Sequence, residues 1–455
     1  MLGGGLRDFV TAAIALGAIP MIFRRPWIGI VIWSWLAYMN PHKLSYGWAH
    51  DFPFAKVTAL VTLMAMLAYK GRKRIPWMRE SVLVLLLAIW MSVTTAFAFF
   101  PDAAFETWDK VWKIMLFTFL TMMLINTRDK VIVLIWTIVV SLGLYGFKGG
   151  VFTLLTGGAY AVYGPVETFI GGNNEIGLAL IMTVPWIRYI QLTDPRRWVR
   201  TGMVVLMLLT TVAILGTQSR GAFVGVLVMY MVMFLKNLRQ IFFVIFAGVL
   251  FYGMVQFMPD TWHERMGTMK DYKADQSAMG RINAWWMAFH LANDHPVLGG
   301  GFETFQPQLF RIYAPDPNNV HDVHSIYFEM LGEQGYPGLI MYLLLGLFAL
   351  LSARRIIRLS KGDPELNWAY HFGSMMQVSL VGYAVTGAFL GLSHFDLYYA
   401  LIGLLVVVKD LFARGLAKAP PDPEIPHWVA RLVLARPGVS PSASPVSPRR
   451  LRRVG

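Results

Sequence analysis

The segment SVLVLLLAIWMSVTTAFAFF, residues Ser81–Phe100, carries no charged side chain over its whole length. A helix needs about 20 predominantly apolar residues to cross the hydrocarbon core of a bilayer. Similar segments, without the polar face that a surface helix of a soluble protein requires, recur along the chain at Val131–Phe147, Thr201–Gly216, Ile241–Met258, Leu339–Leu351 and Tyr398–Val408. The pattern predicts an all-α polytopic membrane protein.

The composition of the 455-residue chain agrees with this class. Hydrophobic residues make up 56% of it and charged residues only 15%, whereas soluble domains are about 25% charged. The net charge of +14 would also suit a protein that binds nucleic acid. Most lysines and arginines, however, stand in short clusters between the apolar segments, as the positive-inside rule predicts for cytoplasmic loops. We therefore attribute the charge to membrane topology and expect no nucleic-acid partner.

The basic clusters arrange the apolar segments into hairpins. They lie at Arg24-Arg25, Lys70–Arg74, Arg128/Lys130, Arg196–Arg200, Lys236/Arg239 and Arg354–Lys361. Placing each cluster in the cytoplasm gives about twelve transmembrane helices, with both ends of the chain inside. The segment Leu6–Asn40 stays open in this scheme, because it can form one broken unit or two spans.

On this topology the chain divides into four parts. Residues 1–258 form transmembrane helices with short loops, residues 259–335 form a large helical loop on the outer side of the membrane, and residues 336–413 form the last transmembrane helices. Residues 414–455, rich in Pro, Ser and Arg, are expected to be a disordered basic cytoplasmic tail. We expect the chemistry in the large loop, since polar groups close to a membrane are costly and usually functional.

The large loop contains a histidine suited to proton transfer. The sequence HDVHS, residues 321–325, precedes the apolar run Ile326–Leu331, and Ser325 is a predicted helix N-cap. His324 would then stand at the mouth of a helix, where the helix dipole and nearby arginines keep an imidazole neutral. A neutral imidazole can act as a general base near pH 7. A zinc site at His321 and His324 lacks a third-ligand motif, so we expect no metal.

Arginines outside the basic clusters are candidate ligands for anions. Arg220 stands at the outer end of a span, and Arg281 begins the Trp-rich helix INAWWMAFHLAN, which suits the membrane surface. Guanidinium groups bind phosphates bidentately, although an arginine at the end of a span can equally be snorkelling to the interface. Further candidate substrate contacts in the outer loops are Arg265, Arg311, His321, Lys148 and Asn174.

These motifs together resemble the signature of the bacterial O-antigen ligase superfamily. RINAWWMAFHLANDHPVLGGGFETF (281–305) and HSIYFEMLGEQGYPG (324–338) are similar to its succession of Arg and Trp, a Pro-, Leu- and Gly-containing turn, His-Ser or His-Asn, and a closing Gly-rich segment. TQSRGA (217–222) resembles the outer arginine motif of the family, and Ser325 stands where many members carry Asn. RRPWIG (24–29) and the segment that follows resemble a subgroup identified as O-glycosylation ligases.

The resemblance implies a GT-C-like glycosyltransferase of the bacterial inner membrane, with its active site on the periplasmic side and with no cofactor. The donor would be a glycan on undecaprenyl pyrophosphate, and the acceptor a sugar hydroxyl of lipid A–core. The histidine of the family corresponds to His324, and its two key arginines correspond to Arg220 and Arg281. One base with direct displacement implies inversion at the anomeric carbon. Retention would need a carboxylate nucleophile, for which Glu303, Asp316 and Asp322 are candidates.

The resemblance leaves the acceptor open. O-antigen polymerases and protein O-oligosaccharyltransferases share the signature, so another repeat unit or a protein Ser or Thr could replace the core sugar. A polysaccharide transporter is the alternative from a different class. Such a protein should show internal repeats and interrupted helices, which the sequence does not clearly contain.

Overall fold

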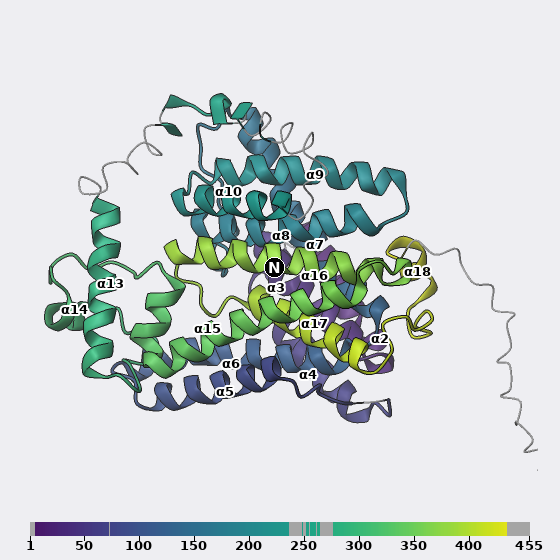
Figure 1. The fold of residues 1–455 in the computed structure, drawn as a ribbon, viewed down its shortest axis with the longest axis horizontal. Coiled ribbons are helices and arrows are strands. Elements are labelled where there is room, and N and C mark those ends of the chain that lie inside the picture. Colours follow the sequence, from purple (N-terminus) through teal and green to yellow (C-terminus); the bar gives the residue numbers. More distant parts are fainter. Residues whose placement is uncertain are drawn as a thin grey trace, which may run out of the picture.

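The computed structural model describes residues 5–71, 73–235, 248, 252–253, 255–260, 262–263 and 276–434. These residues form helices joined by turns and loops, and none of them lies in a strand (Figure 1). The α-helices are α1 (Leu6–Gly17), α2 (Ile19–Arg24), α3 (Trp27–Met39), α4 (Phe54–Ala68), α5 (Arg79–Ala96), α6 (Pro101–Leu124), α7 (Arg128–Leu155), α8 (Asn173–Thr193), α9 (Arg197–Gly216), α10 (Arg220–Leu235), α13 (Gln276–Asp294), α14 (Pro307–Tyr313), α15 (Ile326–Ser360), α16 (Asn367–Thr386), α17 (Asp396–Ala413) and α18 (His427–Leu432). Short 3₁₀ helices are η1 (Pro41–Leu44), η2 (Trp48–His50), η5 (Pro364–Leu366) and η6 (Gly387–Phe389).

The predicted all-helical class is confirmed. Six helical segments in the described part of the chain are long and apolar enough to cross a membrane: Leu6–Arg24, Arg79–Ala96, Arg128–Leu155, Asn173–Thr193, Arg197–Gly216 and Ile326–Ser360. Three shorter apolar helices accompany them, namely Trp27–Met39, Phe54–Ala68 and Arg220–Leu235. The total of about twelve spans and the GT-C-like architecture stay predictions, and most of the predicted span Ile241–Met258 lies outside the described residues.

Close packing between α7 and α9 corrects the predicted start of an outer loop. A Cβ added to Gly146 would lie 2.3 Å from Thr210 Oγ1, and one added to Gly150 would lie 2.2 Å from the carbonyl oxygen of Leu209. These glycines therefore let two helices approach each other instead of opening a turn. The prediction that Lys148 lies in a loop is wrong, because α7 continues to Leu155 and carries Lys148 as an exposed side chain.

The segment after α17 also differs from its prediction. Lys130 forms ion pairs with Glu424 at 2.7 Å and with Asp422 at 3.5 Å, and Ile425 is buried in the main core. The tail predicted as disordered is thus packed against the bundle from residue 414 to 434. Its acidic residues form ion pairs with a buried lysine, and the net basic composition of the segment does not reveal this pairing. Residues 435–455 lie outside the described residues.

The helices of the large loop gather at one end of the bundle. In Figure 1, α13 runs across the direction of the long helices, at the end where α15 begins, with α14 beside it. Ala284, Met287 and Leu291 of α13 share a small apolar core with Leu309 and Phe310 of α14. This second core holds the loop helices together and places the segment between α14 and α15 against the bundle.

Candidate active site

Two glycine-rich segments pack against each other backbone to backbone and shape this end of the bundle. The main-chain nitrogen of Gly300 donates a hydrogen bond to the carbonyl oxygen of Gly332 at 2.8 Å. Gly335 has φ 65° and ψ −173°, a region that is essentially restricted to glycine. A Cβ on Gly335 would lie 2.4 Å from the carbonyl oxygen of Val297. Gly335 therefore kinks α15 without ending it.

His324 lies immediately before the first turn of α15. Its φ of 40° is uncommon for a residue other than glycine, and backbone strain of this kind concentrates at functional sites. Ser325 takes the predicted N-cap position, but its side chain is buried and makes no capping hydrogen bond. The helix therefore begins at the predicted position, but the predicted capping hydrogen bond of Ser325 is not formed.

The surroundings of His324 favour a neutral imidazole. Its side chain is 27% exposed, and Nδ1 lies 3.5 Å from Oδ2 of Asp322. Burial lowers the pKa of His324 below its ordinary value of 6.5, the Asp322 carboxylate partly offsets this, and Arg281 lowers the pKa further. Nδ1 is buried without a hydrogen-bond partner, so Asp322 acts on the imidazole through its charge. The low pKa thus comes first from burial, whereas the sequence suggested the helix dipole and arginines.

Helix α13 supports the loop that carries His324. The amide nitrogen of Asn283 donates hydrogen bonds to the carbonyl oxygens of Asp316 and Asn319, at 2.8 Å and 2.9 Å. Arg281 lies two residues earlier on the same helix, and its charge acts on His324. The structure therefore brings Arg281 and His324 together, as the sequence predicted for residues of one site.

The tryptophans of α13 have different roles. Nε1 of Trp285 donates a hydrogen bond to the carbonyl oxygen of Val323 at 2.8 Å, and its ring stacks on Phe328 with centroids 5.1 Å apart. Trp285 therefore fixes the residue before His324, so the expectation that it is a membrane anchor is wrong. Trp286 is 49% exposed, as an anchor should be.

Arg220 begins α10 after a tight turn. The hydroxyl of Ser219 accepts a hydrogen bond from the main-chain nitrogen of Ala222 at 3.2 Å and so caps the helix. The amide of Asn173, at the start of α8, donates to the carbonyl oxygen of Thr217 at 2.9 Å. Arg220 consequently stands at the positive end of the α10 dipole, a position that favours negatively charged neighbours.

Helix η6 lies between the helix of Arg220 and the helix that follows His324. A Cβ on Gly221 would lie 2.9 Å from Cβ of Phe389, and a Cβ on Gly387 would lie 2.6 Å from Cδ1 of Ile326. Glu175, in the first turn of α8, also acts electrostatically on His324. The first turns of α10 and α15 therefore both pack against η6.

Two further predicted residues lie in this region. The ring of His321 packs over Gly280 of α13, where an added Cβ would lie 2.6 Å from it, and its charge acts on His324. Asn174 is half-buried in the first turn of α8, beside the residue that bonds to the Arg220 turn. Both positions are compatible with substrate contact.

The remaining predicted contacts are not brought into this cluster by any described interaction. Arg311 is exposed on the short helix α14, and Lys148 is exposed on α7. Arg265 lies outside the described residues.

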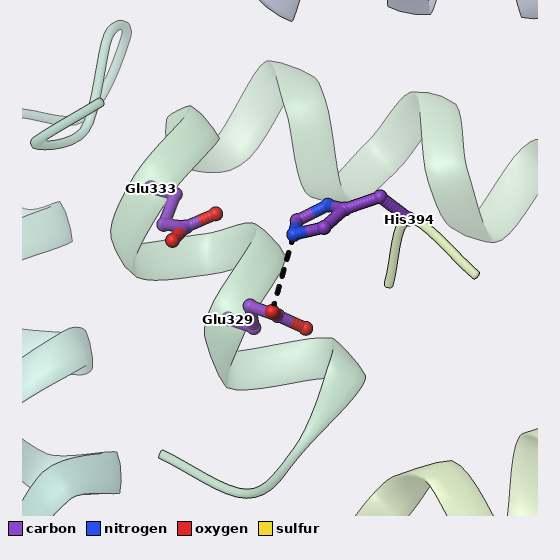
Figure 2. Close-up of side chains that lie close together, drawn as sticks. All are labelled: Glu329, Glu333 and His394. Carbon is purple, nitrogen blue, oxygen red and sulfur yellow. Dashed lines mark ion pairs between the residues drawn. The ribbon is translucent and has the colours of Figure 1, made fainter. Parts of the chain in front are cut away.

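A buried cluster next to this site has no motif in the sequence. The side chains of Glu329, Glu333 and His394 place one ligand atom each within 4.8 Å of the others (Figure 2). The two glutamates stand one turn apart on α15, and His394 comes from the segment between η6 and α17. The four-residue spacing of the glutamates is a weak signal, and nothing in the apolar surroundings of His394 connects it with them.

The geometry supports proton transfer and anion binding at one end of the bundle. His324 offers a neutral imidazole beside the Asp322 carboxylate, and the positive charge of Arg281 acts on it. Such a set can deprotonate a hydroxyl and stabilise an anionic leaving group.

Comparison with known families gives two matches. Residues 202–343 match the profile of a family described as O-antigen ligase, and this range contains Arg220, Arg281 and His324. Residues 6–194 match a family of unknown function. No curated protein matches the chain.

Proposed function

We propose that the chain, whose residues 202–343 match the O-antigen ligase family, transfers an O-antigen glycan from undecaprenyl pyrophosphate to a sugar hydroxyl of lipid A–core. The reaction takes place at the periplasmic face of the bacterial inner membrane. The observation that carries the proposal is the strained, half-buried His324, with a carboxylate at Nδ1 and Arg281 beside it, inside the matched range.

In the proposed reaction, Nε2 of His324 accepts the proton of the acceptor hydroxyl. The hydroxyl oxygen then forms a bond to the anomeric carbon of the donor sugar. The bond from that carbon to the pyrophosphate oxygen breaks, and its electron pair leaves with undecaprenyl pyrophosphate. A single displacement of this kind inverts the anomeric configuration, because no covalent glycosyl-enzyme intermediate forms.

Arg281 and Arg220 stabilise the negative charge that develops on the leaving pyrophosphate. Such preorganised positive groups usually supply the largest electrostatic contribution to a reaction. Because the arginines provide the charge that a metal would otherwise bring, the transfer step uses no metal ion as a Lewis acid. The leaving group also needs no protonation, since pyrophosphate leaves readily as an anion.

The deciding experiment uses the purified full-length protein with a glycan on undecaprenyl pyrophosphate. Lipid A–core, a second repeat unit on the lipid carrier, and a Ser/Thr-containing protein are offered as separate acceptors. We expect glycosylated lipid A–core, formed without nucleotide and in freshly added chelator. Product on one of the other acceptors alone would replace the ligase by a polymerase or a protein glycosyltransferase. Absence of product on all three would overturn the proposed function and leave the transporter.

A further inference from the structure

The cluster of Glu329, Glu333 and His394 has the donor set of a metal site. Figure 2 shows the three side chains converging from α15 and from the segment before α17. Nε2 of His394 lies 3.4 Å from Oε1 of Glu329, and the three ligand atoms all lie within 4.8 Å of one another. Atoms bound to one ion with bonds of about 2.0–2.2 Å are separated by distances of this order.

Each of the three side chains has its second polar atom held in place. Oε2 of Glu329 accepts a hydrogen bond from the main-chain nitrogen of Ser393 at 2.9 Å. Oε1 of Glu333 accepts one from the main-chain nitrogen of Glu303 at 3.1 Å. Nδ1 of His394 lies 2.9 Å from the hydroxyl of Ser393. Outer hydrogen bonds of this kind orient metal ligands in proteins, and here they leave one donor atom of each residue facing the centre.

One of these three ligand atoms has no hydrogen-bond partner. Oε2 of Glu333 is buried without a hydrogen-bond partner, although the residue is only 5% exposed. Within the described part of the chain, no lysine or arginine forms an ion pair with Glu329 or Glu333. Two carboxylates thus share one imidazole in a nearly buried space. Buried charge without compensation is costly, and a bound cation removes that cost.

We propose that Glu329, Glu333 and His394 bind one divalent transition-metal ion of the Zn²⁺ or Mn²⁺ type. The ligand atoms are Oε1 of Glu329, Oε2 of Glu333 and Nε2 of His394. Two carboxylates with one imidazole suit these ions. The ion connects α15 to the segment before α17 directly, and to the turn that contains Glu303 through the hydrogen bond on Glu333.

This ion is a resident structural ion, and the site is independent of the proposed transfer reaction. Two of its ligands, Glu329 and Glu333, lie on the part of α15 that follows His324. The role of the ion is to hold the first turns of α15 in place. An ion enclosed by three nearly buried side chains is not expected to leave during brief exposure to chelator. The proposal is therefore compatible with a transfer step in which arginines carry the positive charge.

The test begins with elemental analysis of the full-length protein, purified in detergent without chelator. We expect about one equivalent of a divalent transition metal per chain, because a structural site retains its ion through purification. Glu333→Gln and His394→Ala should lose the metal. Glu365→Gln is the matched control, since this exposed glutamate forms an ion pair with Lys418 and takes no part in the site. Ser393→Ala should weaken binding by ~10-fold, the usual effect of an outer-shell change.

A second measurement separates metal loss from misfolding. After prolonged chelation, Zn²⁺ or Mn²⁺ should raise the thermal unfolding midpoint of the wild-type protein and leave that of Glu333→Gln unchanged. A wild-type protein that carries no divalent metal and takes up neither ion would overturn the proposal and assign a proton to Glu333. Equal metal content in wild type, Glu333→Gln and His394→Ala would overturn it as well. A protein that transfers glycan but binds no divalent metal at these residues would refute only this inference, whereas a filled site without transfer to any acceptor would refute only the proposed function.

Discussion

At the scale of the residue, His324 is proposed to remove the proton of the acceptor. His324→Ala should lower the rate of glycan transfer by ~10²-fold or more, the usual contribution of a general base. Donor binding should survive, because the pyrophosphate is held by arginines. His321→Ala is the informative comparison, since that ring packs over Gly280 beside the same site. An initial rate that falls in His321→Ala and not in His324→Ala would show that His324 is not the base.

The pH profile tests the same residue independently. Burial lowers the pKa of His324 below 6.5, and the Asp322 carboxylate acts in the opposite direction. A base must be neutral, so kcat/KM should fall with decreasing pH only below pH 6.5. Asp322→Asn removes the carboxylate and should move this acidic limb to still lower pH. A limb that moves to higher pH in Asp322→Asn would contradict the proposed arrangement.

The two proposed pyrophosphate ligands should not tolerate lysine. Arg220→Lys and Arg281→Lys keep the charge but lose the planar fork that binds two phosphate oxygens, so each should slow transfer. Arg354→Lys, at an exposed position near the far end of α15, serves as the control and should transfer normally. Wild-type rates in both Arg220→Lys and Arg281→Lys would remove the diphosphate clamp from the mechanism.

Residues of one site differed in how well the sequence revealed them. His324 and Arg281 belong to a polar stretch between apolar segments, and their motif made both predictable. The Glu329, Glu333 and His394 cluster could not be predicted, because His394 joins it only when the segment before α17 folds back on α15. The same limit applies to Asp322. The sequence offered it only as a candidate nucleophile, and its place beside Nδ1 of His324 is a property of the fold, as is the burial that dominates the pKa of that histidine.

Among the secondary-structure elements, α15 shapes the site, because its kink at Gly335 sets how the two glycine-rich segments pack together. Gly335→Ala should lower stability by about 1–3 kcal/mol through its backbone conformation alone, and more through the contact of the new Cβ with Val297. The nearest atom to a Cβ on Gly346, in the same helix, is the Tyr398 hydroxyl at 3.5 Å. Gly346→Ala is therefore the control and should be neutral or slightly stabilising. Thermal unfolding of the purified variants measures the difference, and equal midpoints would contradict it.

Elements were predicted best where a single cause decides them. The long apolar helices follow from their composition alone. Glycine has two uses, however, and the sequence alone did not distinguish them around Lys148. There the glycines of α7 face α9, so they mark close helix packing instead of a loop.

At the scale of the whole molecule, the predicted topology places α13 and His324 outside and the basic cluster at the end of α15 inside. The chain has no cysteine, so single cysteines can be introduced at the exposed positions Asn318 and Lys361. An impermeant thiol reagent applied to intact spheroplasts should label Asn318→Cys and spare Lys361→Cys until the membrane is opened. The reverse labelling pattern would invert the topology and remove the periplasmic reaction with it.

Composition predicts the overall class of the molecule, but it does not predict the packing of the C-terminal segment. Charge depletion and long apolar segments fix an all-helical membrane protein. The packing of residues 414–434 depends on the ion pair between the buried Lys130 and the half-buried Glu424, which joins positions far apart in the chain. The local composition of a Pro-rich, basic segment does not reveal a partner that lies so far away in the sequence.

The contact between the glycine turn and the kinked helix has a consequence for saturation mutagenesis. Gly299 and Gly335 face the main chain of the opposite segment, so almost any side chain added at these two glycines would push the two segments apart. In a survey of all single substitutions they should score as intolerant as His324. The two classes become separable once protein abundance is measured beside growth, because the glycine variants should be depleted from the membrane while His324 variants accumulate as inactive protein.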